Sequence, residues 1–507
     1  MLNRLIGWAL ANRVIVLATS VVLLLGGAWT AWRMPVDVFP DLTAPTVTVL
    51  TEAHGMAPEE VEALVSFPIE TSVNGATGVR RVRSSTAQGI SVVWVEFDWG
   101  TDIFRARQIV AEKLQTVAAA LPVGISAPVL APVSSVMGEI LMIGLTGTQS
   151  PTELRTVADW TIRRRLLAVP GVAQVIPIGG AVKQYQVLAD PARMMQAGVS
   201  LEQVVRAARG SNANASGGVY MDRGQEYVIR GIGRVQSVAD IASTVVAVRG
   251  GTPITLGQVA DVTVGTAPRF GDGSVNAEPG VVLAVQKQPG ANTLELTARI
   301  ERELAALQPT LPVGMKVHTE LFRQASFIRV AVDNVLKALR DGAVLVVIVL
   351  FLFLWNLRAT AISVIAIPLS LVVAIFAMKL LGISINTMTL GGMAIAIGAL
   401  VDDAIIDVEN VFRRLRENHH RPPAEQRSAL RVVYDASKEI RASIVNATLI
   451  IIVVFLPLFF LGGVEGRLLR PLGFAYVVSI LASLLVAVTV TPVLCAYLLP
   501  NLSLIHI

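Results

Sequence analysis

The stretch Gly-Ala-Leu-Val-Asp-Asp-Ala-Ile-Ile-Asp-Val-Glu-Asn, residues 398–410, places four carboxylates in an otherwise apolar segment. An uncharged run that begins at Leu380 leads into it, and together they predict one membrane-spanning helix over roughly 387–412. A charged side chain at the centre of a bilayer costs about 2.5–3.5 kcal/mol on insertion scales. Acids kept at that cost are typical of a proton or ion pathway, formed here by Asp402, Asp403, Asp407 and Glu409.

Helix geometry relates these acids to one another. At about 100° per residue, Asp402 and Glu409 lie about 20° apart, and Asp403 and Asp407 about 40° apart. All four fit on an arc of about 160°, which we expect to face the interior of a helix bundle. Neighbouring buried acids repel when both are charged, which favours binding and release of protons near neutral pH. The alternatives are structural salt bridges to helices outside this chain and, for Glu409, an interfacial position that costs little.

Hydrophobicity is distributed unevenly along the 507 residues, 53% of which are hydrophobic. Residues 14–32 carry no charge, and 34–330 have the pattern of soluble α+β sequence. The basic start and a weak cleavage-like Gly-Gly-Ala allow a signal peptide, but the length of the first run favours an uncleaved helix. Further apolar runs of near-spanning length then predict six membrane helices in all; these runs cover 342–357, 359–378, 380–401, 442–464 and 471–500.

The loop 413–441 sets the predicted orientation, because it holds eight Lys and Arg residues against four acids. Such a loop is expected on the cytoplasmic side, which puts 34–330 on the outer side and both chain ends inside. The excess of basic residues in this loop therefore indicates membrane topology and not nucleic-acid binding. The single cysteine, Cys495, lies in the last helix, which excludes a disulfide within the chain and a cysteine metal site in the external domain.

The external region contains a repeat. Two stretches, 67–79 and 160–172, each read as a helix and a Gly turn followed by two strands, with a strand before and a second helix after. This is the split βαβ, or ferredoxin-like, arrangement. Residues 211–275 interrupt it and predict an inserted β-rich docking lobe. The strands expected are 46–51, 90–97, 139–145, 184–188, 227–230, 244–248, 281–287 and 315–319; the helices are 102–119, 200–209 and 293–306.

The predicted fold is thus a membrane α-helical bundle of six transmembrane helices with a large periplasmic α+β domain. Its parts are a first helix with a cytoplasmic N-terminus at 1–33, a first porter subdomain at 34–134, a second at 135–210 and 276–330, the docking lobe at 211–275, transmembrane helices 2–4 at 331–412, the basic loop at 413–441, helices 5–6 at 442–500, and an uncertain tail at 501–507.

This organisation resembles half of a resistance–nodulation–division (RND) efflux transporter, and the segment 391–410 resembles the signature of that family's fourth helix. Phe39-Pro-Asp-Leu-Thr-Ala-Pro, Phe67-Pro-Ile-Glu and Asp102-Ile-Phe-Arg-Ala-Arg resemble its heavy-metal branch. The resemblance implies a proton antiporter of the bacterial inner membrane that works as a homotrimer with a periplasmic adaptor and an outer-membrane channel. Asp402 and Asp403 match the family's acidic positions. Since family chains are about twice as long, we expect an N-terminal half.

The substrate expected by resemblance is a heavy-metal cation. Pumps for Cu(I) and Ag(I) carry Met where this chain has Asp407, and the chain has no Met after Met393. This favours a divalent ion such as Zn(II), Co(II) or Ni(II). Glu139 matches a position where divalent-metal pumps carry an acid, which makes it the candidate metal ligand. The pairs Met194–Met195 and His419–His420 and the isolated His54 and His318 are interpreted as packing or surface residues.

Two other functions stay open. A drug or hydrophobic-compound exporter of the same fold would need an aromatic-rich cleft, and only 6% of this chain is aromatic. A non-transporting scaffold or sensor would not need Asp402 or Asp403. The lone Gly231-Ile-Gly233 lacks the Lys-Ser/Thr of a phosphate loop, so ATP is not expected as the energy source. We expect neither an enzyme activity nor a cofactor.

Overall fold

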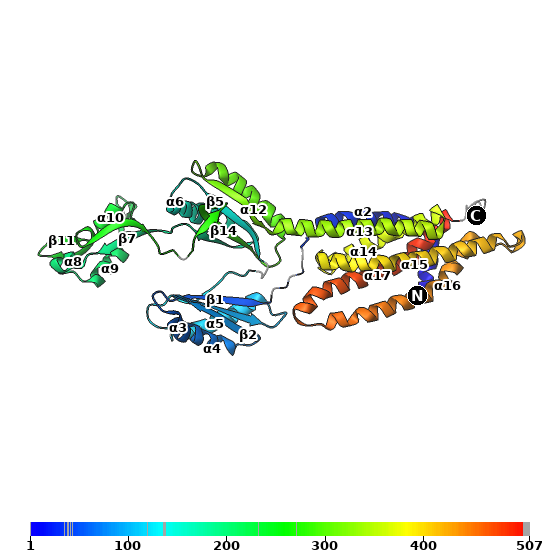
Figure 1. Cartoon of the computed structure of the whole chain (residues 1–507), viewed down its shortest axis with the longest axis horizontal. Helices are drawn as coiled ribbons and strands as arrows, with labels where there is room; N and C mark the ends of the chain where they lie inside the picture. Colours follow the sequence, from blue (N-terminus) through cyan, green and yellow to red (C-terminus); the bar gives the residue numbers. More distant parts are fainter. Residues whose placement is uncertain are drawn as a thin grey trace.

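The molecule has a bundle of long helices at one end and a small lobe at the other, with two α+β subdomains lying side by side between them (Figure 1). The computed structural model describes residues 2–34, 36–37, 40, 42, 44–118, 120–134, 138–231, 233–269 and 271–499. The predicted tail at 501–507 lies outside the described residues.

Long helices separated by short connections form the bundle. Five of the described helices, α2 and α14–α17, are long and apolar enough to cross a membrane. In α13, Lys337, Arg340 and Asp341 precede a shorter apolar run, so the sixth span stays a prediction. The bounds are α1 (Leu2–Ala11), α2 (Arg13–Arg33), α13 (Gln324–Leu354), α14 (Leu357–Leu380), α15 (Thr387–His419), α16 (Ala429–Phe455) and α17 (Gly463–Leu498).

Helix α15 packs mainly against α17. At Gly392 an added Cβ would overlap the backbone oxygen of Leu472, so this glycine lets the two backbones approach closely. Gly391 and Gly398 face open space within the described chain. The predicted cytoplasmic loop is largely helical, because α15 continues to His419 and α16 begins at Ala429. Among the described helices of the bundle, the amphipathic α1, which packs on α16 and α17, was not expected.

Subdomain 1 is a four-stranded sheet covered by helices, with strand order β2-β3-β1-β4. The sequence predicted it well, since β1 and β3 have the expected positions and a two-residue turn with Gly89 in the left-handed region joins β2 to β3. Its core buries Phe97, Ile69 and Val95 completely, each worth about 1.5–3 kcal/mol. The elements are β1 (Thr46–Glu52), α3 (Pro58–Val61), η1 (Glu62–Ser66), α4 (Phe67–Asn74), β2 (Val79–Ala87), β3 (Ile90–Phe97), α5 (Ile103–Ala118) and β4 (Val129–Leu130).

Subdomain 2 has the same topology. Four strands of its five-stranded sheet pair in the order β6-β14-β5-β15, which repeats the order 2-3-1-4 of subdomain 1, and β13 also pairs with β14. The elements are β5 (Glu139–Thr146), α6 (Pro151–Val157), η2 (Ala158–Ile162), α7 (Arg163–Leu167), β6 (Val172–Gly179), β13 (Gly273–Val275), β14 (Glu278–Lys287), α12 (Thr293–Leu307), η3 (Gln308–Thr310) and β15 (Lys316–Arg323).

The predicted boundary of the docking lobe at residue 211 is wrong. β7 (Lys183–Ala189), expected as a strand of subdomain 2, pairs instead with β12 (Ala260–Thr266), and α9 (Leu201–Gly210) packs in the lobe. β7 is polar and largely exposed, whereas β14 carries the continuous buried run that a central strand requires. The third strand and second helix of the repeat are therefore β14 and α12. The lobe is inserted into the hairpin between the second and third strands.

The lobe has a small core around Val199, Val204, Ile241 and Leu256. From it projects the hairpin β8–β9, whose residues are exposed, among them Val219, Tyr220 and Val228. The remaining elements are α8 (Pro191–Ala197), β8 (Ala215–Asp222), β9 (Gln225–Gly231), α10 (Val238–Ala242), β10 (Val245–Arg249), β11 (Thr252–Thr255) and α11 (Leu256–Val259).

Candidate functional site: the carboxylates of α15

A precise N-terminal cap fixes where α15 begins. Asn386 accepts a hydrogen bond from the backbone N–H of Thr389, and the Thr389 hydroxyl accepts one from the N–H of Asn386, both within a buried environment. The helix then continues without a break to His419. Asp402 lies about 22 Å from its start and Glu409 about 33 Å, at 1.5 Å per residue. The acids are therefore well inside a helix of membrane-spanning composition.

Asp403 points toward α17. Its Oδ2 atom accepts a hydrogen bond of 3.2 Å from the hydroxyl of Ser483, and the side chain is half-buried. Ser483 belongs to a helix whose inner face also carries buried Ser479 and Thr491. The sequence reasoning missed Ser483. The signal was available, because the small residues Ala475, Ser479, Ser483 and Ala487 recur every four residues and so mark one face of the last helix.

Asp407 is the most enclosed of the four, with 2% of its surface exposed. Ser437 of α16 and Cys495 of α17 lie beside it. Neither carboxyl oxygen of Asp407 has a hydrogen bond of good geometry among the described residues, although the Ser437 hydroxyl lies close enough to interact with the carboxyl group. An ionised carboxylate held without a partner in an apolar surrounding is very unfavourable. The position therefore suits a group that exchanges a proton, or one that waits for a water or ion.

Asp402 and Glu409 point elsewhere. Both are exposed on the described chain, on a face of α15 that also carries exposed Ile395 and Gly398. The expectation that all four acids face the interior of this bundle is thus wrong for these two. The four acids span an arc of about 160° around α15, and α16 and α17 cover only the part of this arc that carries Asp403 and Asp407.

None of the four acids forms an ion pair with a basic side chain in the described part of the chain. Basic residues begin only at the helix end, where Arg413 donates to Asn410, and Asn410 in turn donates to the Ala436 carbonyl of α16. Arg414 pairs with Glu439 of α16 at 2.6 Å. The C-terminal part of α15 is therefore anchored to α16, while the acids before it have no basic partner among the described residues.

Glu139 is the first residue of β5, half-buried at one end of the subdomain 2 sheet, where it is aligned with Gln286. Within the described residues, no group of three or more His, Cys, Asp or Glu side chains could hold a metal ion. His54 lies exposed next to Glu52, and His318 contacts Thr146. The described residues thus form no such group around Glu139, and its role as a metal ligand stays a prediction.

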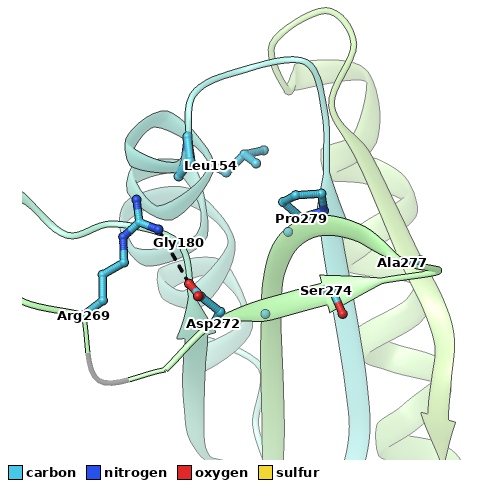
Figure 2. Close-up of a pocket in the computed structure, with 10 residues that line it drawn as sticks. Leu154, Gly180, Arg269, Asp272, Ser274, Ala277 and Pro279 are labelled. Atoms are coloured by element: carbon cyan, nitrogen blue, oxygen red, sulfur yellow. Dashed lines mark ion pairs between the residues drawn. The ribbon is translucent and has the colours of Figure 1, made fainter.

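A cavity of about 390 Å³ lies on the other end of subdomain 2, between α6 and the β13–β14 hairpin (Figure 2). Arg269 and Asp272 are the charged residues in its lining, and they pair with each other at 3.7 Å. Their charges cancel, and no metal-binding side chain other than Asp272 lines it. The cavity therefore adds nothing to the carboxylate site.

A membrane bundle with unpaired acids in one helix, carrying two ferredoxin-like subdomains, defines a class of membrane transport protein. The chain matches the AcrB/AcrD/AcrF family over residues 5–504, and it belongs to that family of RND efflux transporters.

Relatives identify the heavy-metal branch. The chain is 36% identical to "Cation efflux system protein CusA" of Escherichia coli (strain K12) over 98% of its own length and 48% of the relative's. It is 34% identical to "Cation efflux system protein CzcA" of Alcaligenes sp. (strain CT14), and the match covers 97% of this chain and 47% of the relative. A crystal structure of a heavy metal efflux pump superimposes with a TM-score of 0.85 at 29% identity, and the match covers 97% of this chain and 48% of that pump's chain. The chain therefore spans about half the length of the relatives it matches.

Proposed function

We propose that the protein works in proton-driven export of heavy-metal cations, with Asp402, Asp403, Asp407 and Glu409 of α15 as the proton-carrying groups. The observation that carries this proposal is the burial of Asp407 with neither carboxyl oxygen in a hydrogen bond of good geometry among the described residues, one helical turn from Asp403, whose single partner there is a serine hydroxyl. Acids that served only as structural ion pairs would need cations beside them. Proton movement supplies about 2.3 kcal/mol per charge for each 100 mV of membrane potential.

The exposed face of α15 fits a larger pump. Gly391 and Gly398 have open space where a Cβ would stand, and Ile395 and Asp402 are exposed beside them. Small residues permit close helix packing in membranes, and an acid there needs shielding from lipid. We infer that further helices of the whole pump cover this face and that Asp402 and Glu409 act at that contact.

The substrate we propose is a divalent cation. Asp407 provides a hard oxygen ligand type where soft-metal transport would favour a thioether, and Glu139 is an acid at one end of the external sheet. The names of the relatives include cation efflux and cobalt–zinc–cadmium resistance proteins. Because Glu139 is a single acid, it would bind a divalent cation only together with ligands from the rest of the pump.

The assembly we propose is a homotrimer in the inner membrane, with residues 34–330 in the periplasm, joined to an adaptor and an outer-membrane channel. The exposed apolar hairpin β8–β9 supports self-association, because Tyr220 and Val228 project from the lobe without a core of their own. The surplus of basic residues in 413–441 supports a cytoplasmic position for the α15–α16 connection.

Growth of a metal-sensitive host tests the function. The whole gene is expressed with a matching adaptor and channel, and growth is scored across Zn, Co, Ni, Cd, Cu and Ag. We expect resistance to one or more divalent ions, with loss of resistance in Asp402→Asn at equal expression.

The matched control is Asp341→Asn, which changes an exposed acid near the start of the apolar part of α13; among the described residues this acid pairs with its neighbour Arg340. Resistance to dyes and detergents without a metal phenotype would contradict the metal substrate. Undiminished resistance in Asp402→Asn would reject its role in the proton pathway.

A further inference from the structure

The segment between α2 and subdomain 1 passes through a junction where three parts of the molecule meet. Val36 forms a parallel β-bridge with Ile385, and the backbone N–H of Asp37 donates to the Ile385 carbonyl at 3.1 Å. Ile385 immediately precedes Asn386, the N-cap of α15. Residues 36–37, which we call the strap, are therefore tied to the first turn of the carboxylate helix.

The side chain of Asp37 holds the strap to subdomain 2. Lys287, the last residue of β14, donates from Nζ to Asp37 Oδ2 at 3.4 Å, and the Thr293 hydroxyl donates to Asp37 Oδ1 at 3.3 Å. Lys287 also donates to Thr293 Oγ1 at 2.8 Å and to the Ala291 carbonyl at 3.1 Å. All three protons of the ammonium group are therefore used.

Burial makes this junction stiff. The side chain of Lys287 is 10% exposed and that of Asp37 34% exposed, and Thr293 is fully buried at the start of α12. Beneath the strap, Met34 and Ile385 are buried in one apolar cluster with Leu390 of α15 and Met378 of α14. A partly buried ion pair with all its donors satisfied resists separation, because breaking it strands a charge.

Subdomain 1 is attached to a different helix. The guanidinium of Arg467, in the first turns of α17, lies 4.6 Å from the ring centroid of Trp99, which follows β3. Subdomain 2, whose strand β15 continues directly into α13, is thus also tied to the start of α15, and subdomain 1 is tied to the start of α17. Asp403 and its partner Ser483 lie at the interface of these same two helices. A displacement of α15 along α17 would change the separation of the two subdomains.

We propose that the strap couples the carboxylate helix to the external domain, with the Asp37–Lys287 ion pair as its attachment to subdomain 2. This inference rests on the proposed proton-driven transport. When the charge state at the α15–α17 interface changes, α15 shifts, and the strap carries subdomain 2 with it. Asp37 and Lys287 are positioning residues, because within the described chain no hydrogen bond or ion pair joins their side chains to the acids of α15 or to Glu139. The backbone N–H of Lys287 does donate to the carbonyl of Gly138, the residue before Glu139, at 2.7 Å.

The test compares removal of one partner with removal of both. Asp37→Asn leaves Lys287 without its counter-charge, so it lowers both stability and coupling. The double variant Asp37→Asn, Lys287→Met leaves no stranded charge, so stability returns toward that of the wild type while the attachment is still missing. A purely structural pair would recover transport in the double variant, and a coupling pair would not.

The measurement is Zn²⁺-dependent proton flux into liposomes that contain the purified protein of the whole gene, with thermal unfolding measured in parallel. We expect Asp37→Asn and the double variant to lose at least tenfold in Zn²⁺-dependent flux, with the double variant unfolding near the wild-type temperature. Asp159→Asn is the matched control: it removes the ion pair with Arg155, which is comparably buried but lies wholly within subdomain 2. Its flux should stay within twofold of the wild type.

The outcomes separate the two claims. Wild-type flux in the double variant, or an equal loss in Asp159→Asn, would overturn the strap while leaving proton-driven transport intact. Absence of Zn²⁺-dependent flux in the wild type, together with absence for Co²⁺, Ni²⁺ and Cd²⁺, would reject the proposed function and the strap with it.

Discussion

Replacing Asp407 by valine should make the protein more stable and inactive at once. Asp407 buries two carboxyl oxygens without a hydrogen bond of good geometry in the described chain, next to the apolar Val408 and Val411 of the bundle core. A buried polar group left unsatisfied costs about 1–3 kcal/mol, and Asp407→Val removes it. We therefore expect a gain of about 1–3 kcal/mol in the free energy of unfolding.

Asp407→Asn is the paired variant. Asparagine has nearly the same size and also buries two polar atoms, so stability should change by less than about 1 kcal/mol. It cannot ionise, so transport should fall as far as in Asp407→Val. A variant that gains stability while losing activity is typical of a functional site held at a cost.

Thermal unfolding of the purified protein in detergent measures the change in stability. For a domain of about 150–250 residues, each kcal/mol shifts the melting temperature by about 2–4 °C. Zn²⁺-dependent proton flux in liposomes measures transport. Two results would refute the reasoning. A lower melting temperature in Asp407→Val would mean that the carboxyl has a stabilising partner, and normal flux in both variants would remove Asp407 from the proton pathway.

Three further changes test other parts of the structure. Gly392→Ala should cost about 1–3 kcal/mol by forcing α15 from the backbone of α17, whereas Gly342→Ala, at a position of α13 with no atom near the added Cβ, should be neutral or slightly stabilising in thermal unfolding. Val219→Ser with Val228→Ser, at exposed paired positions of β8–β9, should leave the melting temperature unchanged and reduce the trimer fraction in light scattering; an unchanged mass would exclude the hairpin from the trimer contact. Ser150→Ala should cost about 0.5–2 kcal/mol by removing the cap of α6. The Ser150 backbone N–H and hydroxyl hold the pKa of Glu153 below its usual value. Their stabilising effect is therefore present at neutral pH and lost as pH falls through that lowered pKa, so the difference between wild type and Ser150→Ala should shrink in acid. A difference that grows in acid would contradict this assignment.

Local pattern was a good guide to the elements of this fold. The strand over 90–97 and the helix over 102–119 are found as β3 (Ile90–Phe97) and α5 (Ile103–Ala118), because alternation and helical spacing are short-range signals. The predicted membrane helices over 14–32, 359–378 and 387–412 likewise correspond to α2, α14 and the first part of α15.

Long-range pairing was not predictable in the same way. The segment 184–188 forms a strand as expected, but its partner β12 lies about 75 residues further along, and nothing local distinguishes that partner from the porter sheet. The ion pair of Asp37 with Lys287 joins residues 250 positions apart, so neither sequence neighbourhood indicates it. The predicted orientation of Asp402 and Glu409 was wrong for a related reason. Sequence spacing gives the angles of the acids around α15, but only the packed structure shows which side of α15 is covered by α16 and α17.

Proton flux that depends on both the metal and Asp402 tests the central claim most directly. Liposomes with a pH-sensitive dye inside would contain the wild-type protein or Asp402→Asn, with the same amount of folded protein in each. We expect Zn²⁺ to start a proton flux in the wild type and Asp402→Asn to reduce that flux at least tenfold. Equal Zn²⁺-dependent flux in the two preparations would contradict the central claim.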